Sequence, residues 1–226
     1  VTGNPQTQRE FFFQCYYDIF KRLVGERQKI IEVGCGRGTL ALYFGLDGKD
    51  VTCVDINADA VKLAKKNFQE KGIRGKFVES DACNLPFGKE TYDATISVGL
   101  IEHLENNDWK TCLREQYRIL KEGGMLVFIN VPKKFSIQTF FQKHDDYHRE
   151  NIIPQEYTEY CHLIGFQHAN FFYINPFPLI WTESLKTERI ITYIYKAIYR
   201  FRSLFKFYPM EGSKLFSQAH ILICIK

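Results

Sequence analysis

A glycine-rich loop between two apolar segments constrains the fold more than any other feature of the chain. Residues 30–33 are mostly branched and apolar, which is typical of a buried strand, and Gly34, Gly36 and Gly38 follow directly. Residues 39–44 then form an apolar run that favours a helix. Closely spaced glycines allow a tight turn in which backbone N–H groups face a ligand. The segment therefore predicts a ligand site where a strand of an α/β fold ends.

A dinucleotide loop is the first alternative for such a segment, because its glycines bring the backbone close to a pyrophosphate. That fingerprint requires its third glycine at position 39, where this chain has Thr39. The predicted strand also contains an acid, Glu32, which is unsuited to a pyrophosphate and suits a ligand that carries a cation. Glu32 could instead be an exposed acid at a strand end, although its apolar neighbours favour a role in binding. A nicotinamide-dependent dehydrogenase is thus a disfavoured alternative.

A second acid closes the next predicted strand, which covers residues 50–55. In a doubly wound sheet, an acid at this place accepts hydrogen bonds from the ribose hydroxyls of an adenosine. Asp55 could also cap the helix that starts near Ala58, but Asn57 is better placed to do so. We therefore predict that Asp55 binds a ribose.

The loop from Glu32 to Gly38, taken together with Asp55, resembles that of the class I S-adenosylmethionine-dependent methyltransferases. The resemblance covers residues 28–131 closely and implies S-adenosylmethionine as cofactor, with the loop against its methionine part and Asp55 on its ribose. In this family the position of Glu32 holds water or contacts the methionine amine. The cofactor-binding residues predicted on this basis are Glu32, Gly34, Cys35, Gly36, Gly38, Asp55, Ile56, Asp81, Ala82 and Ser97.

Three later segments agree with the resemblance in order and spacing. A third strand over 76–80 leads to Asp81, which resembles the adenine-binding segment of the family, although such an Asp is also common in turns. A fourth strand over 92–98 leads to the stretch 99–104, which is similar to that of small-molecule methyltransferases, including those of quinone biosynthesis. Residues 118–129 indicate a helix, a glycine pair that caps it, and a strand.

Length and the order of elements bound the architecture. A chain of 226 residues can form one substantial core, and strands that alternate with helices from 29 to 130 indicate a mostly parallel sheet. The resemblance implies an α/β, Rossmann-like sheet of seven strands with helices on both faces and an antiparallel last strand inserted between the fifth and sixth. We predict a single domain over 1–226, with an N-terminal helical lid over 9–24 and a substrate-side cap insertion over 176–212.

The pattern after residue 131 is less regular. Residues 132–153 are loop-like, and a helix is predicted over 154–164, where Gly165 stops it. A strand over 166–174 follows, and the stretch 215–225 is rich in β-forming residues and predicts the last strand.

Composition excludes several other classes of protein. The net charge of +4 implies no polyanionic partner by itself. The seven cysteines are scattered singly, which fits reduced thiols and argues against a disulfide framework or a zinc site. The sequence has no run of about 18 apolar residues, so it predicts no membrane-spanning helix. The first residues lack the basic and apolar regions of a signal peptide. We therefore expect a cytoplasmic protein without a metal ion.

Two histidines are candidates for catalysis. His103 could accept the proton that an oxygen or nitrogen nucleophile loses on methylation, although the same position in the family often only shapes the pocket. His144 and His148 have the spacing of metal ligands on a helix, but the stretch is poorly helical and no third ligand is evident. We expect His148 to face the substrate mouth and His144 to lie in a solvated loop.

Residues 189–208 form a basic amphipathic pattern with two interpretations. Six apolar residues fall at spacings that share one helix face, namely Ile190, Ile191, Ile194, Ile198, Phe201 and Phe205. We favour a cap that turns this face inward over the substrate end of the sheet, because amphipathic helices in globular proteins usually face a core. Peripheral contact with an anionic membrane surface is the alternative. Nucleic acid is a weaker alternative, given the small net charge.

These observations predict a methyltransferase that moves a methyl group from S-adenosylmethionine to a small-molecule acceptor. The aromatic residues of the predicted cap favour an apolar or aromatic acceptor. A non-catalytic subunit or sensor that binds S-adenosylmethionine is the alternative, because it would share the cofactor loop and differ only at the mouth. The acceptor itself, the atom methylated, the use of a general base and the oligomeric state are not determined by the sequence.

Overall fold

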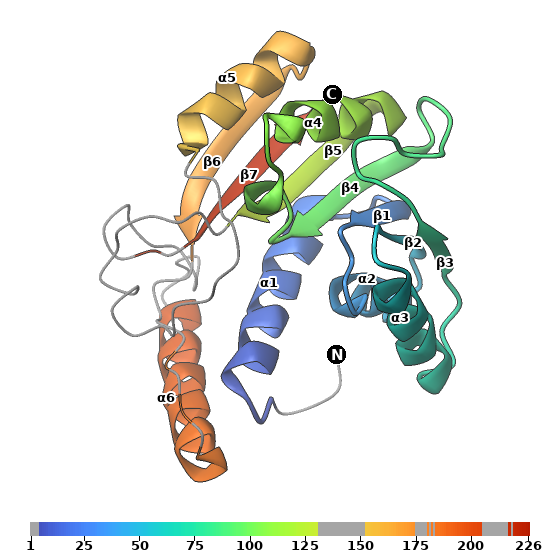
Figure 1. Ribbon diagram of the computed structural model, residues 1–226. Helices are drawn as coiled ribbons and strands as arrows, with labels where there is room; N and C mark the ends of the chain where they lie inside the picture. Colours follow the sequence, from blue (N-terminus) through green and yellow to red (C-terminus); the bar gives the residue numbers. More distant parts are fainter. Residues whose placement is uncertain are drawn as a thin grey trace.

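The computed structural model describes residues 5–130, 152–174, 180, 182, 184–204, 217 and 219–226. This part of the chain forms one seven-stranded sheet in the order β3-β2-β1-β4-β5-β7-β6 (Figure 1). The strands are β1 (Lys29–Val33), β2 (Asp50–Asp55), β3 (Lys76–Glu79), β4 (Tyr92–Val98), β5 (Leu120–Asn130), β6 (His168–Ile174) and β7 (Ala219–Ile225).

Strand directions agree with the sequence prediction. Strands β1 to β5 pair in parallel, whereas β7 pairs antiparallel with both β5 and β6. The last strand is therefore inserted between the fifth and the sixth, as predicted. From β1 the chain first builds outward to β2 and β3 and then returns to place β4 on the other side of β1. Such a reversal of strand order opens a crevice at the carboxyl ends of the two central strands.

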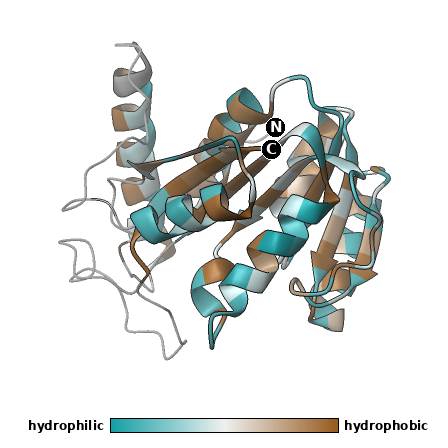
Figure 2. Cartoon of the chain, turned by 90° about the horizontal axis from the view of Figure 1, so that it is seen from above, coloured by the Kyte–Doolittle hydropathy of each residue, from teal (hydrophilic) through white to brown (hydrophobic). Residues whose placement is uncertain are grey.

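Helices cover both faces of the sheet. They are α1 (Gln8–Val24), α2 (Thr39–Leu46), α3 (Ala58–Glu70), the short 3₁₀ helix η1 (Ile101–His103), α4 (Asp108–Ile119), α5 (Pro154–Ile164) and α6 (Leu185–Leu204). One apolar cluster joins α1, α2 and α3 to the sheet, and a second joins α4 and α5 to the opposite face (Figure 1). In β1, Ile30 belongs to the first cluster and Ile31 to the second. Several central strands are accordingly brown, hence apolar, in Figure 2.

Local sequence signals explain where several helices begin and end. Thr7 and Glu10 form a capping box at the start of α1, in which each side chain accepts a hydrogen bond from the other residue's backbone N–H. Asn57 caps α3 through its side-chain oxygen, so the capping role weighed for Asp55 belongs to Asn57. Gly165 ends α5 in a left-handed conformation, as predicted.

The glycine pair after α4 differs from its predicted role. The helix ends at Ile119, Leu120 is already extended, and both glycines lie inside β5. Gly123 adopts a left-handed φ of 70° and donates its N–H to the carbonyl oxygen of Lys226 at 3.0 Å. Gly123 thus adopts the left-handed conformation expected of the pair, but within a strand and not at a helix end. The local sequence did not reveal this because the partner, Lys226, comes from the far end of the chain.

Several predicted features lie outside the described residues. They are His144 and His148, most of the loop 132–153, residues 205–208 of the basic helix and much of the predicted cap. No described helix is long and apolar enough to cross a membrane. The part of the chain that the structure describes also contains no group of three or more side chains that could hold a metal ion. All seven cysteines are described, and each is a free thiol.

Candidate functional site

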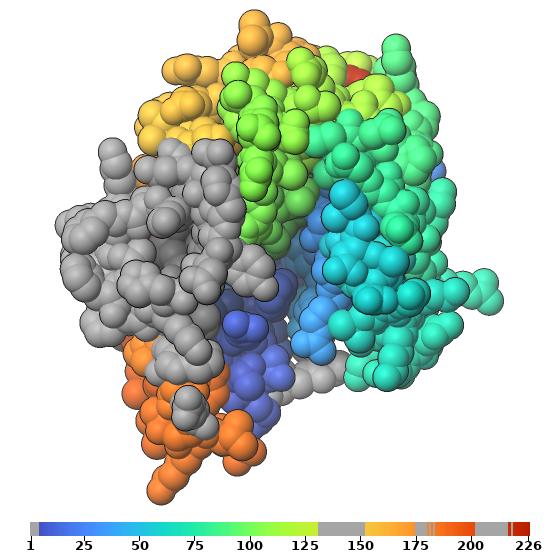
Figure 3. Space-filling view, viewed as in Figure 1, coloured from blue at the N-terminus to red at the C-terminus, as the bar shows by residue number. Residues whose placement is uncertain are grey.

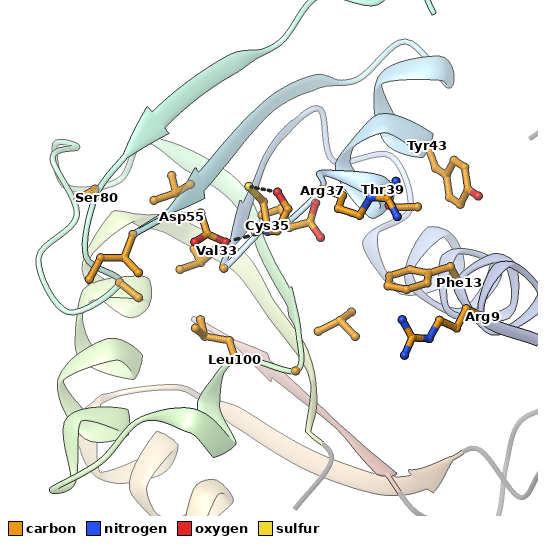
Figure 4. A pocket seen from close by; sticks show the side chains of 18 of the residues that line it. Arg9, Phe13, Val33, Cys35, Arg37, Thr39, Tyr43, Asp55, Ser80 and Leu100 are labelled. Carbon is orange, nitrogen blue, oxygen red and sulfur yellow. Dashed lines mark hydrogen bonds between the residues drawn. The ribbon is translucent and has the colours of Figure 1, made fainter. Parts of the chain in front are cut away.

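A cavity of about 630 Å³ lies at the carboxyl ends of β1, β2 and β4, at the crevice where the strand order reverses (Figure 3). The loop between β1 and α2 forms its floor, and residues after β2, β3 and β4 form one side. The first turns of α1 form the opposite side, so that Asp55 and Ser80 face Arg9, Phe13 and Tyr43 across the cavity (Figure 4). The topology thus concentrates residues from five segments at one place.

The three glycines of the β1–α2 loop all have left-handed φ angles, but their surroundings differ. A Cβ on Gly34 would lie 2.9 Å from Cδ1 of Leu100, and a Cβ on Gly38 would lie 2.9 Å from Cβ of Ala64 on α3. A Cβ on Gly36 would meet nothing within 4 Å. Gly38 therefore serves the packing of two helices, whereas Gly36 lines the cavity and leaves open space where a side chain would stand.

Glu32 is buried at the end of β1 and lines the cavity. Its Oε2 accepts a hydrogen bond from the backbone N–H of Ala41 at 2.8 Å, which ties the strand to the first turns of α2. Burial raises the pKa of this carboxyl from its ordinary value of 4.5 to about 8, and the nearby charge of Asp55 adds to the effect against the lowering from the Ala41 hydrogen bond. A buried carboxyl whose pKa lies near neutral pH loses its proton readily when a cation enters the cavity, because the nearby positive charge favours the carboxylate.

Asp55 stands at the end of β2 and braces the glycine loop. Its Oδ2 accepts a hydrogen bond from the N–H of Gly36 at 2.8 Å, and its Oδ1 accepts one from the N–H of Asn57 at 2.9 Å. Beyond β3, Asp81 accepts a hydrogen bond from the N–H of Cys83 at 2.8 Å. Both carboxylates line the cavity and keep further lone pairs for hydroxyl or amine donors of a ligand.

The structure brings most of the predicted residues together. The cavity is lined by Glu32, Gly34, Cys35, Gly36, Asp55, Ile56, Asp81 and Ala82. Three predicted residues are not among those lining it: Gly38 packs on α3, Ser97 is buried within β4, and His103 is exposed on η1. The two residues that follow Ser97, namely Val98 and Gly99, line the cavity instead. His148 lies outside the described residues.

Several residues of the site were not predicted individually. Arg9 and Phe13 project from α1, which the sequence suggested only as an aromatic lid, and Tyr43 projects from α2 (Figure 4). Glu102 is buried in η1, where its Oε1 would lie 3.6 Å from a Cβ on Gly99. Its charge also contributes, after burial and Cys15, to the raised pKa of Tyr16. The only sequence signal for Glu102 was its place in the 99–104 stretch.

The comparison with protein families agrees with this geometry. The model of a methyltransferase domain matches residues 30–124, which hold the glycine loop, Asp55 and Asp81. Residues 30–124 therefore form a methyltransferase domain. The resemblance recognised in the sequence is confirmed.

Curated relatives of the methyltransferase domain act on varied molecules according to their names. The chain is 31% identical over 66% of its length to 2-methyl-6-phytyl-1,4-hydroquinone methyltransferase 1, chloroplastic, of Oryza sativa subsp. japonica, and covers 44% of that protein. It is 33% identical over 49% of its length to a ubiquinone/menaquinone biosynthesis C-methyltransferase of Pectobacterium carotovorum, and covers 45% of it. A fatty-acid O-methyltransferase of Mycolicibacterium smegmatis is 27% identical over 56% of the chain and is covered to 46%. The chain thus spans less than half the length of these relatives.

Solved structures share the fold of the whole chain. A SAM-dependent methyltransferase from Archaeoglobus fulgidus superimposes with a TM-score of 0.66 at 19% identity, covering 97% of this chain and 95% of the other. The [4+2]-cyclase SpnF superimposes with a TM-score of 0.69 at 18% identity, covering 99% and 85%. At these identities the likeness establishes the fold alone. The cyclase shows that chemistry must be argued from the site.

Proposed function

We propose that the protein transfers a methyl group from S-adenosylmethionine to a small, largely apolar acceptor. The observation that supports this most is the meeting of the glycine loop, Asp55 and Asp81 around one cavity. The cavity fits the cofactor in a specific respect: the loop leaves open space at Gly36, where any side chain would protrude. Glu32, whose pKa lies near neutral pH, is on the same floor and favours a cationic ligand.

Different residues of the site would bind different parts of the cofactor. Asp55 would bind the ribose hydroxyls, and Asp81 with the backbone of Ala82 would bind the adenine. The glycine loop would hold the methionine part, with Glu32 on the side of its amine. Arg9, across the cavity on α1, supplies the positive charge that suits the methionine carboxylate. Bound in this way, S-adenosylmethionine supplies an electrophilic methyl group on a positively charged sulfur.

The remaining wall of the cavity favours an apolar acceptor. Phe13, Val98, Leu100 and Leu104 line it and contribute little hydrogen-bonding capacity. Their role would be to exclude water and to hold the acceptor in line with the methyl group, which can supply most of the acceleration. The names of the relatives, a phytyl hydroquinone and a fatty-acid methyltransferase, fit such an acceptor.

Proton transfer stays a separate prediction. His103 is exposed and is not among the residues lining the cavity, so a role as base would require the acceptor to reach beyond the cavity. Buried Glu102, next to Gly99, is closer to the lining and is a second candidate for positioning or accepting a proton. The lid role of residues 9–24 is supported by the side chains of α1 in the cavity. The cap over 176–212, the cytoplasmic location and the role of His148 stay predictions.

Calorimetric titration tests the cofactor assignment first. The wild-type protein should bind S-adenosylmethionine and not NAD, and Asp55→Ala should weaken binding about 10- to 100-fold, since two hydrogen bonds to the ribose are lost. Asp59→Ala is the matched control, because Asp59 is an exposed acid on α3 in a surface ion pair. Binding of NAD, or equal effects of the two substitutions, would overturn the assignment.

Transfer of labelled methyl to a fractionated cell extract then tests the reaction. We expect the label in the organic phase, and none with Asp55→Ala. Label in an aqueous or macromolecular fraction would refute the apolar acceptor. Tight binding of S-adenosylmethionine without label in any fraction would support the alternative of a non-catalytic binding subunit.

A further inference from the structure

One face of helix α6 packs against α1. Glu188 accepts hydrogen bonds from the backbone N–H and the side-chain Nε2 of Gln8, at 2.8 and 2.7 Å. Tyr195 is 6% exposed and its ring centroid lies 6.0 Å from that of Phe12. Tyr199 donates a hydrogen bond to Asp18 at 2.9 Å. These contacts lie on one side of the helix, and all of them are made to α1.

The opposite side of α6 is apolar and exposed. Ile190, Ile194, Ile198 and Phe201 are 52%, 48%, 38% and 61% exposed, and their spacings of four, four and three residues align them in one stripe. The sequence predicted that this stripe faces inward as a cap. In the structure these four residues face outward, because the tyrosines and Glu188 contact α1 from the other side. Ile191 of the predicted face packs against the first apolar cluster, and Phe205 lies outside the described residues. None of the described residues of α6 lines the cofactor cavity.

Positive charge accompanies the stripe. Helix α6 contains five basic residues, Lys186, Arg189, Lys196, Arg200 and Arg202, and one acid, Glu188. That acid is turned toward Gln8 and so lies on the packed face. Lys186, Arg189 and Arg200 are exposed. Helix α6 stands beside α1 at the edge of the molecule (Figure 1). It therefore presents an apolar line with cations at its flank.

We infer that this face of α6 lies on an anionic lipid bilayer, with Ile190, Ile194, Ile198 and Phe201 at the acyl boundary and the arginines at the headgroups. An exposed apolar line bordered by cations is the pattern of helices that lie in the plane of such an interface. A second copy of the chain fits less well, because a symmetric contact would bring the same cations together. A nucleic acid would leave the three isoleucines without a role.

The position of α6 sets this surface apart from the cavity. Helix α6 packs on α1, and α1 presents Arg9 and Phe13 to the cavity. A bilayer on the outer face of α6 would therefore be separated from the cavity by α6 and α1. The inference itself does not depend on methyl transfer, since the exposed stripe and its charges are properties of α6 alone.

Flotation with lipid vesicles tests the inference without any cofactor. The wild-type protein should float with vesicles of phosphatidylcholine and phosphatidylglycerol, should stay behind with phosphatidylcholine alone, and should be released by salt. The double substitution Ile194→Ser with Phe201→Ser should lower partitioning about tenfold or more. Leu163→Ser is the matched control, because Leu163 is 79% exposed on α5 and away from the stripe. The control should partition like the wild type.

Two charge-reversal variants complete the test. Arg189→Glu should weaken binding to anionic vesicles about fivefold or more, whereas Lys65→Glu on α3, an equal change of charge at another exposed position, should change it less than twofold. Absence of wild-type flotation, or equal losses in variants and controls, would overturn the inference. So would a loss of dimer in size-exclusion chromatography of the stripe variant with vesicle binding unchanged. Ile190→Ser alone repeats the test if the double variant unfolds.

Discussion

Two glycines of the β1–α2 loop, together with Gly48 between α2 and β2, allow a three-variant experiment that separates backbone strain, packing and ligand contact. Gly48, Gly36 and Gly38 have φ angles of 82°, 51° and 67°, so alanine at each adopts a left-handed backbone. That conformation costs about 1–2 kcal/mol. A Cβ on Gly48 or Gly36 meets nothing within 4 Å, whereas a Cβ on Gly38 approaches Cβ of Ala64 to 2.9 Å.

The clash at Gly38 has no inexpensive relief. Cβ of Ala64 is attached directly to the backbone of α3, and Sγ of Cys53 lies 3.4 Å away on the sheet side. Overpacking of this kind costs about 1–3 kcal/mol in addition to the backbone strain. We therefore expect Gly38→Ala to lower the free energy of unfolding by about 2–5 kcal/mol, and Gly48→Ala and Gly36→Ala by about 1–2 kcal/mol each.

Urea unfolding and calorimetric titration with S-adenosylmethionine together measure the two effects. Gly36→Ala should weaken cofactor binding about tenfold or more despite its small effect on stability, because its methyl group would occupy the open side of the loop. Gly48→Ala should bind normally. The reasoning is refuted if Gly38→Ala is no less stable than Gly48→Ala, or if Gly36→Ala binds like the wild type.

Three further predictions concern Glu32, Arg9 and His103. The pKa of Glu32 is raised from 4.5 to about 8, so the folded state holds this proton more tightly than the unfolded chain. The contribution of Glu32 to stability should therefore fall as pH rises across that interval. Glu32→Gln should remove that part of the pH dependence in thermal melts. Arg9→Ala should weaken cofactor binding about two- to fivefold, with exposed Arg74→Ala as an unaffected control. In the same titration His103→Ala should change binding less than twofold, far less than Asp55→Ala, and comparable effects would contradict the division between cofactor and acceptor sides.

The cofactor half of the site could be predicted from the sequence because its residues are fixed by local rules. A loop glycine, a strand-end acid and a helix cap each depend on a few neighbouring residues, so Gly36, Asp55 and Asn57 were placed from their immediate context. The topology then brings the strand ends together, since parallel strands all end at the same edge of a sheet.

Features that depend on partners distant in the sequence could not be predicted in this way. Arg9 reaches the cavity only because α1 packs across the sheet, and nothing around Arg9 in the sequence specifies that. Amphipathicity of α6 gave the helix but not its orientation, because Tyr195 and Tyr199 compete with the isoleucines for the packed face. The conformation of Gly123 likewise depends on Lys226, a partner from the opposite end of the chain.

The insertion of β7 between β5 and β6 has a consequence for how the chain folds. Strands β3, β2, β1, β4 and β5 come from one continuous stretch and can pair before the rest of the chain is synthesised. Met125 of β5, in contrast, pairs with Ile225, and β6 reaches the sheet only through β7. Until β7 is made, β5 is an open edge, which is a site for mispairing with other chains. Pairing of β7 with β5 joins the strand neighbours that are farthest apart in the sequence, so we expect it to be the slow step of folding. We also expect β6 to be the first strand lost when β7 is weakened.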